Sequence, residues 1–258
     1  MRPIRTLAMI MAGGKGQRLL PLPEVRSKPA VPFGGNYRII DFVLSNFVNS
    51  GITALYVLVQ YRSQSLIEHL RAAWHMGGRM QPSFVSVVPP QMRAREGWYE
   101  GTADAVYQNL NLIADFDPEV IAVFGADHIY RMDVRQMIRC HLESDADATV
   151  AALPVPIHEA HGFGIIEADA SGRMIGFEEK PSTPKPMPDR PGFALSSMGN
   201  YLFKTETLVP LLIRDAARPG THDFGRNIVP ELLADHRVQI YNLQNNEIPD
   251  LQSYEEQA

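Results

Sequence analysis

The chain has 258 residues, of which 45% are hydrophobic, so it is large enough to bury a sizeable core in one large or two small domains. Its formal net charge of −5 argues against nucleic-acid-binding proteins, which normally present a basic face, and its single cysteine excludes an intrachain disulfide and a cysteine-based zinc site. No apolar run reaches the roughly 18 residues of a membrane span, so we expect a cytoplasmic protein with neither a nucleic-acid nor a membrane partner.

The first part of the chain alternates short apolar runs with amphipathic segments of helix length. The apolar runs predict strands at residues 6–12, 54–60, 84–90 and 119–127. The amphipathic segments predict helices at residues 38–51, 63–74 and 102–115, and Thr102 is the expected N-cap of the last. Continuous apolar strands that alternate with helices are typical of a parallel sheet covered on both faces. Residues 1–147 are therefore predicted to form a Rossmann-like, nucleotide-binding half.

After residue 147, strand-like pieces follow one another with few helices between them. Strands are expected at residues 148–155, 162–169, 172–180, 197–204 and 238–243, and helices at 205–217 and 222–236. Five prolines between residues 181 and 192 predict an exposed connector or, alternatively, a flap near a site. Residues 148–258 would extend the sheet and bind the second substrate. The whole chain is thus predicted to be one α/β domain with a mostly parallel, mixed sheet covered by helices.

A glycine cluster follows the first predicted strand. Gly13, Gly14 and Gly16 would let the backbone approach a phosphate group and present its N–H donors. Lys15 and Arg18 would add positive charge. The spacing matches neither the P-loop nor the dinucleotide-binding fingerprint. The alternative is a tight turn that carries two solvated basic residues.

Two further segments of the first half carry candidate ligand contacts. Lys28 precedes a proline, which favours an extended conformation that would aim the lysine side chain. Trp98 and Tyr99 stand beside Gly101 at the start of a predicted helix. These aromatic residues would form either a stacking wall for a ligand or a plug over the helix N-terminus. The sequence leaves both interpretations open, and it leaves a solvated role open for Lys28.

Charged residues stand at the ends of two predicted strands. Asp127 ends an apolar strand, where a carboxylate is well placed to hold Mg²⁺ bridging phosphate groups, although a turn or N-cap role is the alternative. Glu179 and Lys180 end a later strand, where they could bind a sugar hydroxyl and a phosphate. His158 and His161 have no third ligand nearby in the sequence, so no metal site is expected there.

Taken together, these pieces resemble one family. They occur in the order seen in ADP-glucose pyrophosphorylases (glucose-1-phosphate adenylyltransferases): AGGKGQRL, SKPAVPFGGNYRIIDFVLSNFVNSGI, WYEGTADAV, ADHIYRMD, FEEKP, SMGNYLF and HDFG. The resemblance covers nearly the whole chain. It implies a Rossmann-like nucleotidyltransferase domain that uses Mg²⁺ and joins ATP to α-D-glucose 1-phosphate. The products would be pyrophosphate and ADP-glucose for glycogen synthesis.

The resemblance also implies roles for individual residues. The catalytic residues would be Arg18, Lys28 and Asp127, with Lys28 at the phosphate groups and Asp127 on Mg²⁺. The nucleotide would be held by Gly13, Gly14, Lys15, Gly16, Arg18, Gln60 and Gly101. Glucose 1-phosphate would be bound by Tyr99, Gly164, Glu179, Lys180 and Ser197. Within this last set, Lys180 would take the phosphate, and Glu179 and Ser197 would take hydroxyl groups.

The chain departs from the family pattern in three places, one of which is the order FGADHIY where A-G-D-H is more usual. A D-V-G-T motif, whose aspartate is a second metal ligand in the family, does not occur in the 258 residues, and the predicted fold does not include the family's C-terminal left-handed β-helix. Val25 stands where some bacterial members carry an activator-binding lysine. The missing aspartate leaves open an inactive nucleotide-sugar-binding regulatory subunit. An enzyme for another nucleotide or sugar phosphate and, last, a dehydrogenase are further alternatives. Because family members are commonly tetramers, a homo-oligomer is a further expectation.

Overall fold

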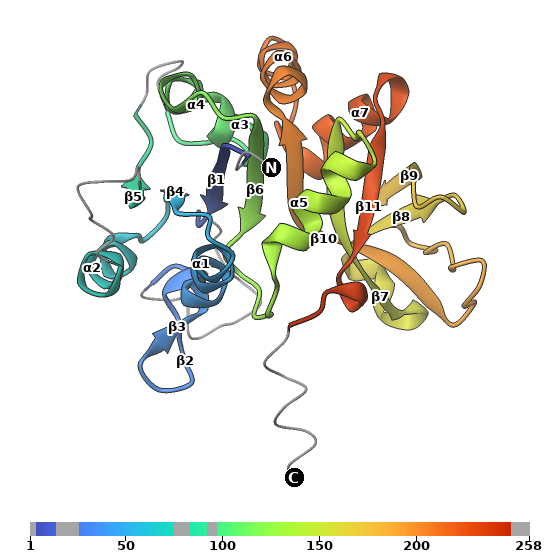
Figure 1. Ribbon diagram of the computed structural model, residues 1–258, viewed down its shortest axis with the longest axis horizontal. Coiled ribbons are helices and arrows are strands. Elements are labelled where there is room, and N and C mark those ends of the chain that lie inside the picture. The colour runs from blue at the N-terminus through green and yellow to red at the C-terminus, as the bar shows by residue number, and fades with distance from the viewer. Residues whose placement is uncertain (1–3, 14–25, 75–82, 92–96, 249–258) are drawn as a thin grey trace.

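A mixed sheet of nine strands runs through the molecule (Figure 1). The structure is a computed structural model that describes residues 4–13, 26–74, 83–91 and 97–248. The main path of the sheet has the order β11-β7-β10-β6-β1-β4-β5, and β8 and β9 extend it from β10. One side of the sheet consists of four parallel strands: β1 (Thr6–Met11), β4 (Ala54–Leu58), β5 (Phe84–Val88) and β6 (Val120–Gly125).

The other side of the sheet has mixed strand directions. It consists of β7 (Ala148–Pro156), β8 (Gly164–Ala168), β9 (Met174–Glu179), β10 (Phe193–Lys204) and β11 (Val238–Asn242). β10 is antiparallel to β6, β7 and β8, whereas β11 is parallel to β7. The predicted α/β class, with a parallel part of the sheet that mixed strands extend, is confirmed.

Helices cover both faces of the sheet, as the continuous apolar strands predict. In β1, Leu7 and Met9 pack into one core cluster and Ala8 and Ile10 into the other, and none of the four is exposed. One face is covered by α1 (Ile39–Asn49), α2 (Gln64–Ala73) and α5 (Val134–Glu143). The opposite face is covered by α3 (Thr102–Tyr107), α4 (Leu110–Phe116), α6 (Thr205–Ala216) and α7 (Val229–Asp235).

The predicted helix at 102–115 is two helices, α3 and α4. The break follows from Asn109, whose Nδ2 donates to the main-chain oxygen of Ala105 four residues earlier and competes with the helical hydrogen bonds. The N-cap of α3 is Gly101, so the prediction that Thr102 is the N-cap is wrong. The Thr102 hydroxyl donates instead to Asp223, 121 residues away.

The predicted helix at 222–236 also divides, into a π-helix at Phe224–Ile228 and α7. The side chain of Asp223 caps the π-helix by accepting from the N–H groups of Gly225 and Arg226. Single-turn π segments occur often at functional sites. Asp223 therefore caps a helix and also accepts a hydrogen bond from the Thr102 hydroxyl.

Shorter elements connect the main ones. A two-stranded hairpin of β2 (Pro32–Phe33) and β3 (Tyr37–Arg38) projects from the sheet below α1 in Figure 1. The 3-10 helices are Lys28–Ala30, Ile157–Gly162 and Leu243–Asn245. The expected extended conformation of Lys28 is therefore wrong, and the extended residue is Ser27 before it. None of the helices within the described ranges combines the length and the apolar character that crossing a membrane would require.

The proline-rich segment 181–192 is mostly exposed and is attached to the neighbouring hairpin. Lys185 forms ion pairs with Glu167 of β8 and Glu178 of β9, the latter at 3.3 Å. These contacts favour the connector interpretation over a flap, because both carboxylates lie on the β8–β9 hairpin that the segment follows.

Candidate active site

A cavity of about 920 Å³ lies beyond the carboxyl ends of β1, β4 and β6, the place where open α/β sheets bind ligands. All the predicted site residues that the structure describes line it: Gly13, Lys28, Gln60, Tyr99, Gly101, Asp127, Gly164, Glu179, Lys180 and Ser197. The remaining four, Gly14, Lys15, Gly16 and Arg18, lie outside the described residues. These predicted residues come from segments up to 184 residues apart in the sequence, from Gly13 to Ser197.

Lys28 and Asp127 both line this cavity and form an ion pair. The Lys28 Nζ lies 3.0 Å from Asp127 Oδ2, and His128 Nδ1 lies 3.3 Å from the other carboxylate oxygen. Desolvation raises the pKa of Asp127, but His128 and Lys28 outweigh it and bring the pKa below its usual value. The carboxylate, two residues beyond the end of β6, is therefore ionised and already accepts a cation.

Asp127 fits a divalent cation that arrives with a nucleotide. Its side chain is 44% exposed, so a cation in the cavity can reach the carboxylate. The carboxylate already pairs with one cation, the Lys28 ammonium. Within the described part of the chain, no three His, Cys, Asp or Glu side chains come together as a metal-binding group. Mg²⁺ is usually bound by one or two protein carboxylates together with substrate phosphates and water. A single carboxylate, Asp127, can therefore be the protein ligand of a magnesium ion that arrives with a nucleotide.

Gln60 holds the main chain of Tyr99 at the cavity wall. Gln60 Nε2 donates to the Tyr99 carbonyl at 3.2 Å, and the Tyr99 N–H donates to Gln60 Oε1 at 3.0 Å. The Tyr99 hydroxyl accepts from Asn109 Nδ2, and burial raises its pKa. The side chain of Trp98 is largely exposed. Both polar atoms of the Gln60 amide thus contact protein, which makes this residue a support for Tyr99.

The far side of the cavity carries a second lysine–carboxylate pair. Lys180 Nζ lies 2.9 Å from Glu179 Oε1. The Lys180 backbone has a φ of +51°, in the left-handed region, and its N–H donates to the Phe163 carbonyl at 3.0 Å. A non-glycine residue in this region is strained and is found often at functional sites. The left-handed conformation of Lys180 turns the chain directly after β9 ends at Glu179, at the cavity.

Glycines leave room for these groups. A Cβ added at Gly164 would come within 2.5 Å of the Phe177 ring and 2.9 Å of Glu179 Oε2. One added at Gly101 would come within 2.2 Å of the carbonyl oxygens of Thr221 and His222. Gly101 therefore permits close backbone packing against the segment 221–222, in addition to lining the cavity.

The packing of residues 221–222 against Gly101 also brings Asp223 to the cavity. No role for Asp223 was predicted from the sequence. Asp223 lines the cavity and accepts from the Thr102 hydroxyl at 2.9 Å. The carbonyl of the preceding His222 accepts from the N–H groups of Ala103 and Asp104, which begins α3. The available signal was the HDFG segment, which the resemblance includes. An Asp before a helix is normally an N-cap, and here it has that role and also faces the cavity.

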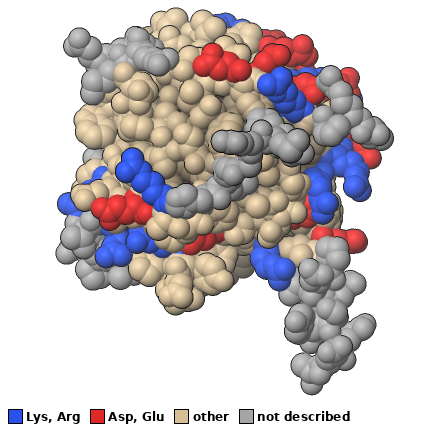
Figure 2. All heavy atoms as spheres, turned by 60° about the vertical axis from the view of Figure 1, so that its left-hand side comes forward, with Lys and Arg blue, Asp and Glu red and all other residues tan. Residues whose placement is uncertain are grey.

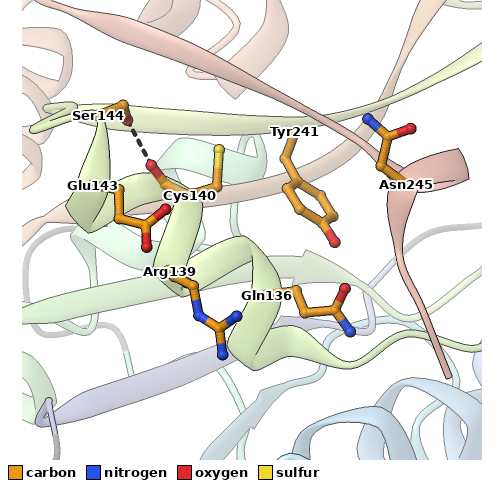
Figure 3. A pocket seen from close by; sticks show the side chains of 7 residues that line it. All are labelled: Gln136, Arg139, Cys140, Glu143, Ser144, Tyr241 and Asn245. Atoms are coloured by element: carbon orange, nitrogen blue, oxygen red, sulfur yellow. Dashed lines mark hydrogen bonds between the residues drawn. The ribbon is translucent and has the colours of Figure 1, made fainter. Parts of the chain in front are cut away.

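A second cavity, of about 420 Å³, lies between α5 and the segment after β11 (Figure 3). Its lining residues are Gln136, Arg139, Cys140, Glu143, Ser144, Tyr241 and Asn245. The Ser144 hydroxyl donates to the Cys140 carbonyl at 2.7 Å, within the last turn of α5. None of these residues is shared with the cavity that holds the predicted site residues.

The described acidic and basic side chains are mixed on the face drawn in Figure 2. Between them lies a broad surface of uncharged residues. This distribution agrees with the modest net charge of −5. Lys28 and Lys180, in contrast, each contribute positive charge inside the first cavity, where a phosphate group could accept from an ammonium.

Comparison with known proteins gives a consistent result. A family model described as "Nucleotidyl transferase" matches residues 7–255. A protein named glucose-1-phosphate adenylyltransferase from Thermodesulfovibrio yellowstonii is 53% identical over 255 residues, which are 98% of this chain and 62% of that protein. Proteins of the same name from Anaeromyxobacter dehalogenans and Thermus thermophilus are 55% and 51% identical. Each alignment covers 95% of this chain and 60% or 61% of the relative. The chain thus spans about three fifths of the length of these relatives.

Proposed function

The chain belongs to the nucleotidyl transferase family, and from this premise we propose that it transfers the adenylyl group of ATP to α-D-glucose 1-phosphate, giving ADP-glucose and pyrophosphate. The names of its relatives support this choice of substrates. The observation that carries the proposal is a single cavity with Lys28 and Asp127 at one side and Glu179 and Lys180 at the other. Each of two anionic substrates needs a positively charged partner, and the two lysines can supply one to each substrate. A cytoplasmic location and a homo-oligomeric state stay predictions.

In the proposed reaction, a phosphate oxygen of glucose 1-phosphate attacks the α-phosphorus of ATP. The new P–O bond forms as the bond from the α-phosphorus to the bridging oxygen breaks, and pyrophosphate leaves with the bonding electrons. Phosphoryl and nucleotidyl transfers of this kind depend mainly on positioning and on neutralising charge. The protein must therefore hold two polyanions in line and offset their repulsion.

The residues divide this task between them. Lys28 would contact the phosphate groups of the nucleotide, and Asp127 would hold Mg²⁺, which when bound neutralises charge on those groups. Lys180 would bind the phosphate of the sugar, while Glu179 would accept hydrogen bonds from sugar hydroxyl groups. Ser197 would add a further hydroxyl contact. Gly13, with Gly14, Lys15, Gly16 and Arg18 after it, is proposed to hold the nucleotide phosphates.

The test is to incubate the protein with ATP, Mg²⁺ and glucose 1-phosphate and to follow pyrophosphate release. We expect turnover with ATP that is much faster than with UTP, GTP or dTTP at equal concentration. Galactose 1-phosphate and mannose 1-phosphate serve as matched sugar controls. Faster turnover with another nucleotide would reassign the base specificity. Saturable binding of both substrates without pyrophosphate release would support a non-catalytic binding protein instead.

A further inference from the structure

The loop that follows β6 carries Asp127 and is held by residues outside the cavity lining. It runs from Ala126 to the N-cap of α5 at Asp133. The Ala126 N–H donates to the Met11 carbonyl of β1 at 3.1 Å, which continues the pairing of the two strands by one residue. Beyond this point none of the described strands pairs with the loop, so we expect side-chain groups to fix the position of Asp127.

Asn200 is one of these groups. It belongs to β10, it has no exposed surface, and both polar atoms of its amide are used. Its Oδ1 accepts from the Gly125 N–H at 3.1 Å, and its Nδ2 donates to the Tyr130 hydroxyl at 2.9 Å. Gly125 precedes Asp127 by two residues and Tyr130 follows it by three. One buried amide therefore contacts the loop on both sides of the carboxylate.

A β-bulge aims Asn200 at this loop. The pairing of β10 with β7 shifts register between Ser197 and Tyr201, and Gly199 has a φ of +68°. Bulges re-aim side chains and are common next to active sites. The strand before the bulge presents Ser197 to the cavity, and the residue after the bulge glycine points its amide to the end of β6.

Asn46 supports the same loop from α1, a helix that covers the sheet. Its Nδ2 donates to the Tyr130 carbonyl at 3.0 Å, and its Oδ1 accepts from the Met132 N–H at 3.1 Å. Tyr130 is thus held at its hydroxyl by Asn200 and at its main chain by Asn46. Two asparagines from distant elements fix a single loop residue.

We propose that Asn200, acting through Gly125 and Tyr130, is a positioning residue for Asp127 and sets the affinity for the divalent metal of the metal–nucleotide complex. This inference rests on the proposed function, because it gives Asp127 the role of metal ligand. Partners that orient a metal ligand typically change metal affinity 10- to 100-fold when they are removed. Asn200 itself touches neither metal nor substrate in this proposal.

The experiment measures Mn²⁺ binding by water-proton relaxation in the presence of α,β-methylene-ATP, which cannot be cleaved at the reacting bond. Asn200→Leu removes both hydrogen bonds, and we expect its apparent Kd for Mn²⁺ to rise about 10-fold or more. Tyr130→Phe removes only the hydroxyl contact, so we expect a rise that is measurable but smaller than that of Asn200→Leu. The Kd for glucose 1-phosphate without metal should stay within about twofold of the wild type in both variants.

Thr149→Val is the matched control. Thr149 is fully buried in β7, where its hydroxyl pairs with His141, and the substitution removes a buried hydrogen bond without touching the loop. It should lower the thermal midpoint but leave the Mn²⁺ Kd unchanged. If Asn200→Leu does not fold, the Mn²⁺ Kd of Tyr130→Phe is the test, because that variant removes one of the two contacts of Asn200.

Two outcomes would overturn the inference. One is a folded variant whose Mn²⁺ Kd equals that of the wild type, and the other is an equal loss of affinity for Mn²⁺ and glucose 1-phosphate. Failure of the proposed function gives a different pattern: a wild type that binds Mn²⁺ with the nucleotide analogue but releases no pyrophosphate from ATP.

Discussion

At the scale of single residues, the cavity is defined by two lysine–carboxylate pairs. Lys28 pairs with Asp127 at 3.0 Å, and Lys180 pairs with Glu179 at 2.9 Å. A substrate phosphate must therefore compete with a carboxylate for each ammonium. The carboxylates prevent the two lysines from standing as uncompensated charges, and they are then free to take a metal or a hydroxyl group when a phosphate arrives.

The first prediction concerns Asp127. Asp127→Asn keeps the shape of the side chain but removes its charge, so the proposed metal position loses its carboxylate. We expect pyrophosphate release to fall by roughly 10²–10³-fold, the usual cost of removing a preorganised electrostatic group. The thermal midpoint should change little, because the carboxylate is 44% exposed. A rate equal to that of the wild type would contradict the assignment of Asp127 to the metal.

The second prediction separates the two substrates. Lys180→Ala removes a charged donor from the far side of the cavity, and the loss of such a donor weakens binding by roughly 10- to 100-fold. We expect the KM for glucose 1-phosphate to rise by that amount and the KM for ATP to change less than about twofold. Steady-state kinetics with each substrate varied in turn give both values. Equal effects on the two KM values would show that Lys180 does not distinguish the sugar phosphate.

At the scale of elements, turns and caps decide where the cavity residues stand. The strands were predictable because continuous apolar runs leave few alternatives, and β1 with its four fully buried residues is an example. The division of 102–115 into α3 and α4 was not, because it depends on one side-chain contact from Asn109 to Ala105. The role of Asn200 depends on a bulge within β10, and no local pattern in the sequence marks such a register shift.

The candidate site was predictable where a residue follows a strand. Gly13, Gln60 and Asp127 come just after β1, β4 and β6, and parallel strands bring their carboxyl ends to one edge of the sheet. Asp223 follows no strand. It reaches the cavity through packing between the segment 221–222 and Gly101, a contact between residues more than a hundred positions apart. Sequence spacing carries no information about such a contact.

The third prediction tests that packing. Gly101→Ala would place a Cβ within 2.2 Å of two backbone oxygens, which cannot move as a flexible side chain can. We expect the free energy of unfolding to fall by about 3 kcal/mol, the upper part of the range for overpacking. Gly192→Ala is the matched control, because a Cβ there would meet nothing within 4 Å. Urea unfolding of both variants checks this, and equal stabilities would contradict the close approach.

At the scale of the whole molecule, a buried histidine that does not line the cavity is expected to make stability depend on pH. His141 of α5 has no exposed surface, and its Nδ1 lies 2.8 Å from the Thr149 hydroxyl. Burial, reinforced by the charge of Lys204, lowers its pKa from 6.5 to about 4. The unfolded chain therefore binds a proton below pH 6.5 that the folded protein does not bind until about pH 4. Acid should favour unfolding in this interval.

The fourth prediction follows from that difference. Because the folded pKa is the lower one, the contribution of His141 to stability is complete above pH 6.5 and is lost as the pH falls toward 4. Between pH 7 and pH 4.5, we expect the wild type to lose about 2–3 kcal/mol more than His141→Gln, which has no titrating group there. Urea unfolding at the two pH values measures the difference. Equal losses in the two proteins would show that His141 does not titrate in this way.

β10 has a consequence for how the protein is made. It lies between β6 and β7, and it is the only described strand that pairs with both. During synthesis, β6 is complete at Gly125, but the strand that covers its free edge ends at Lys204. For almost 80 residues of elongation, a fully apolar strand presents unpaired hydrogen-bonding groups. The nascent chain is then most exposed to wrong pairing, and a ribosome-bound intermediate of this length is the species that a chaperone would have to protect.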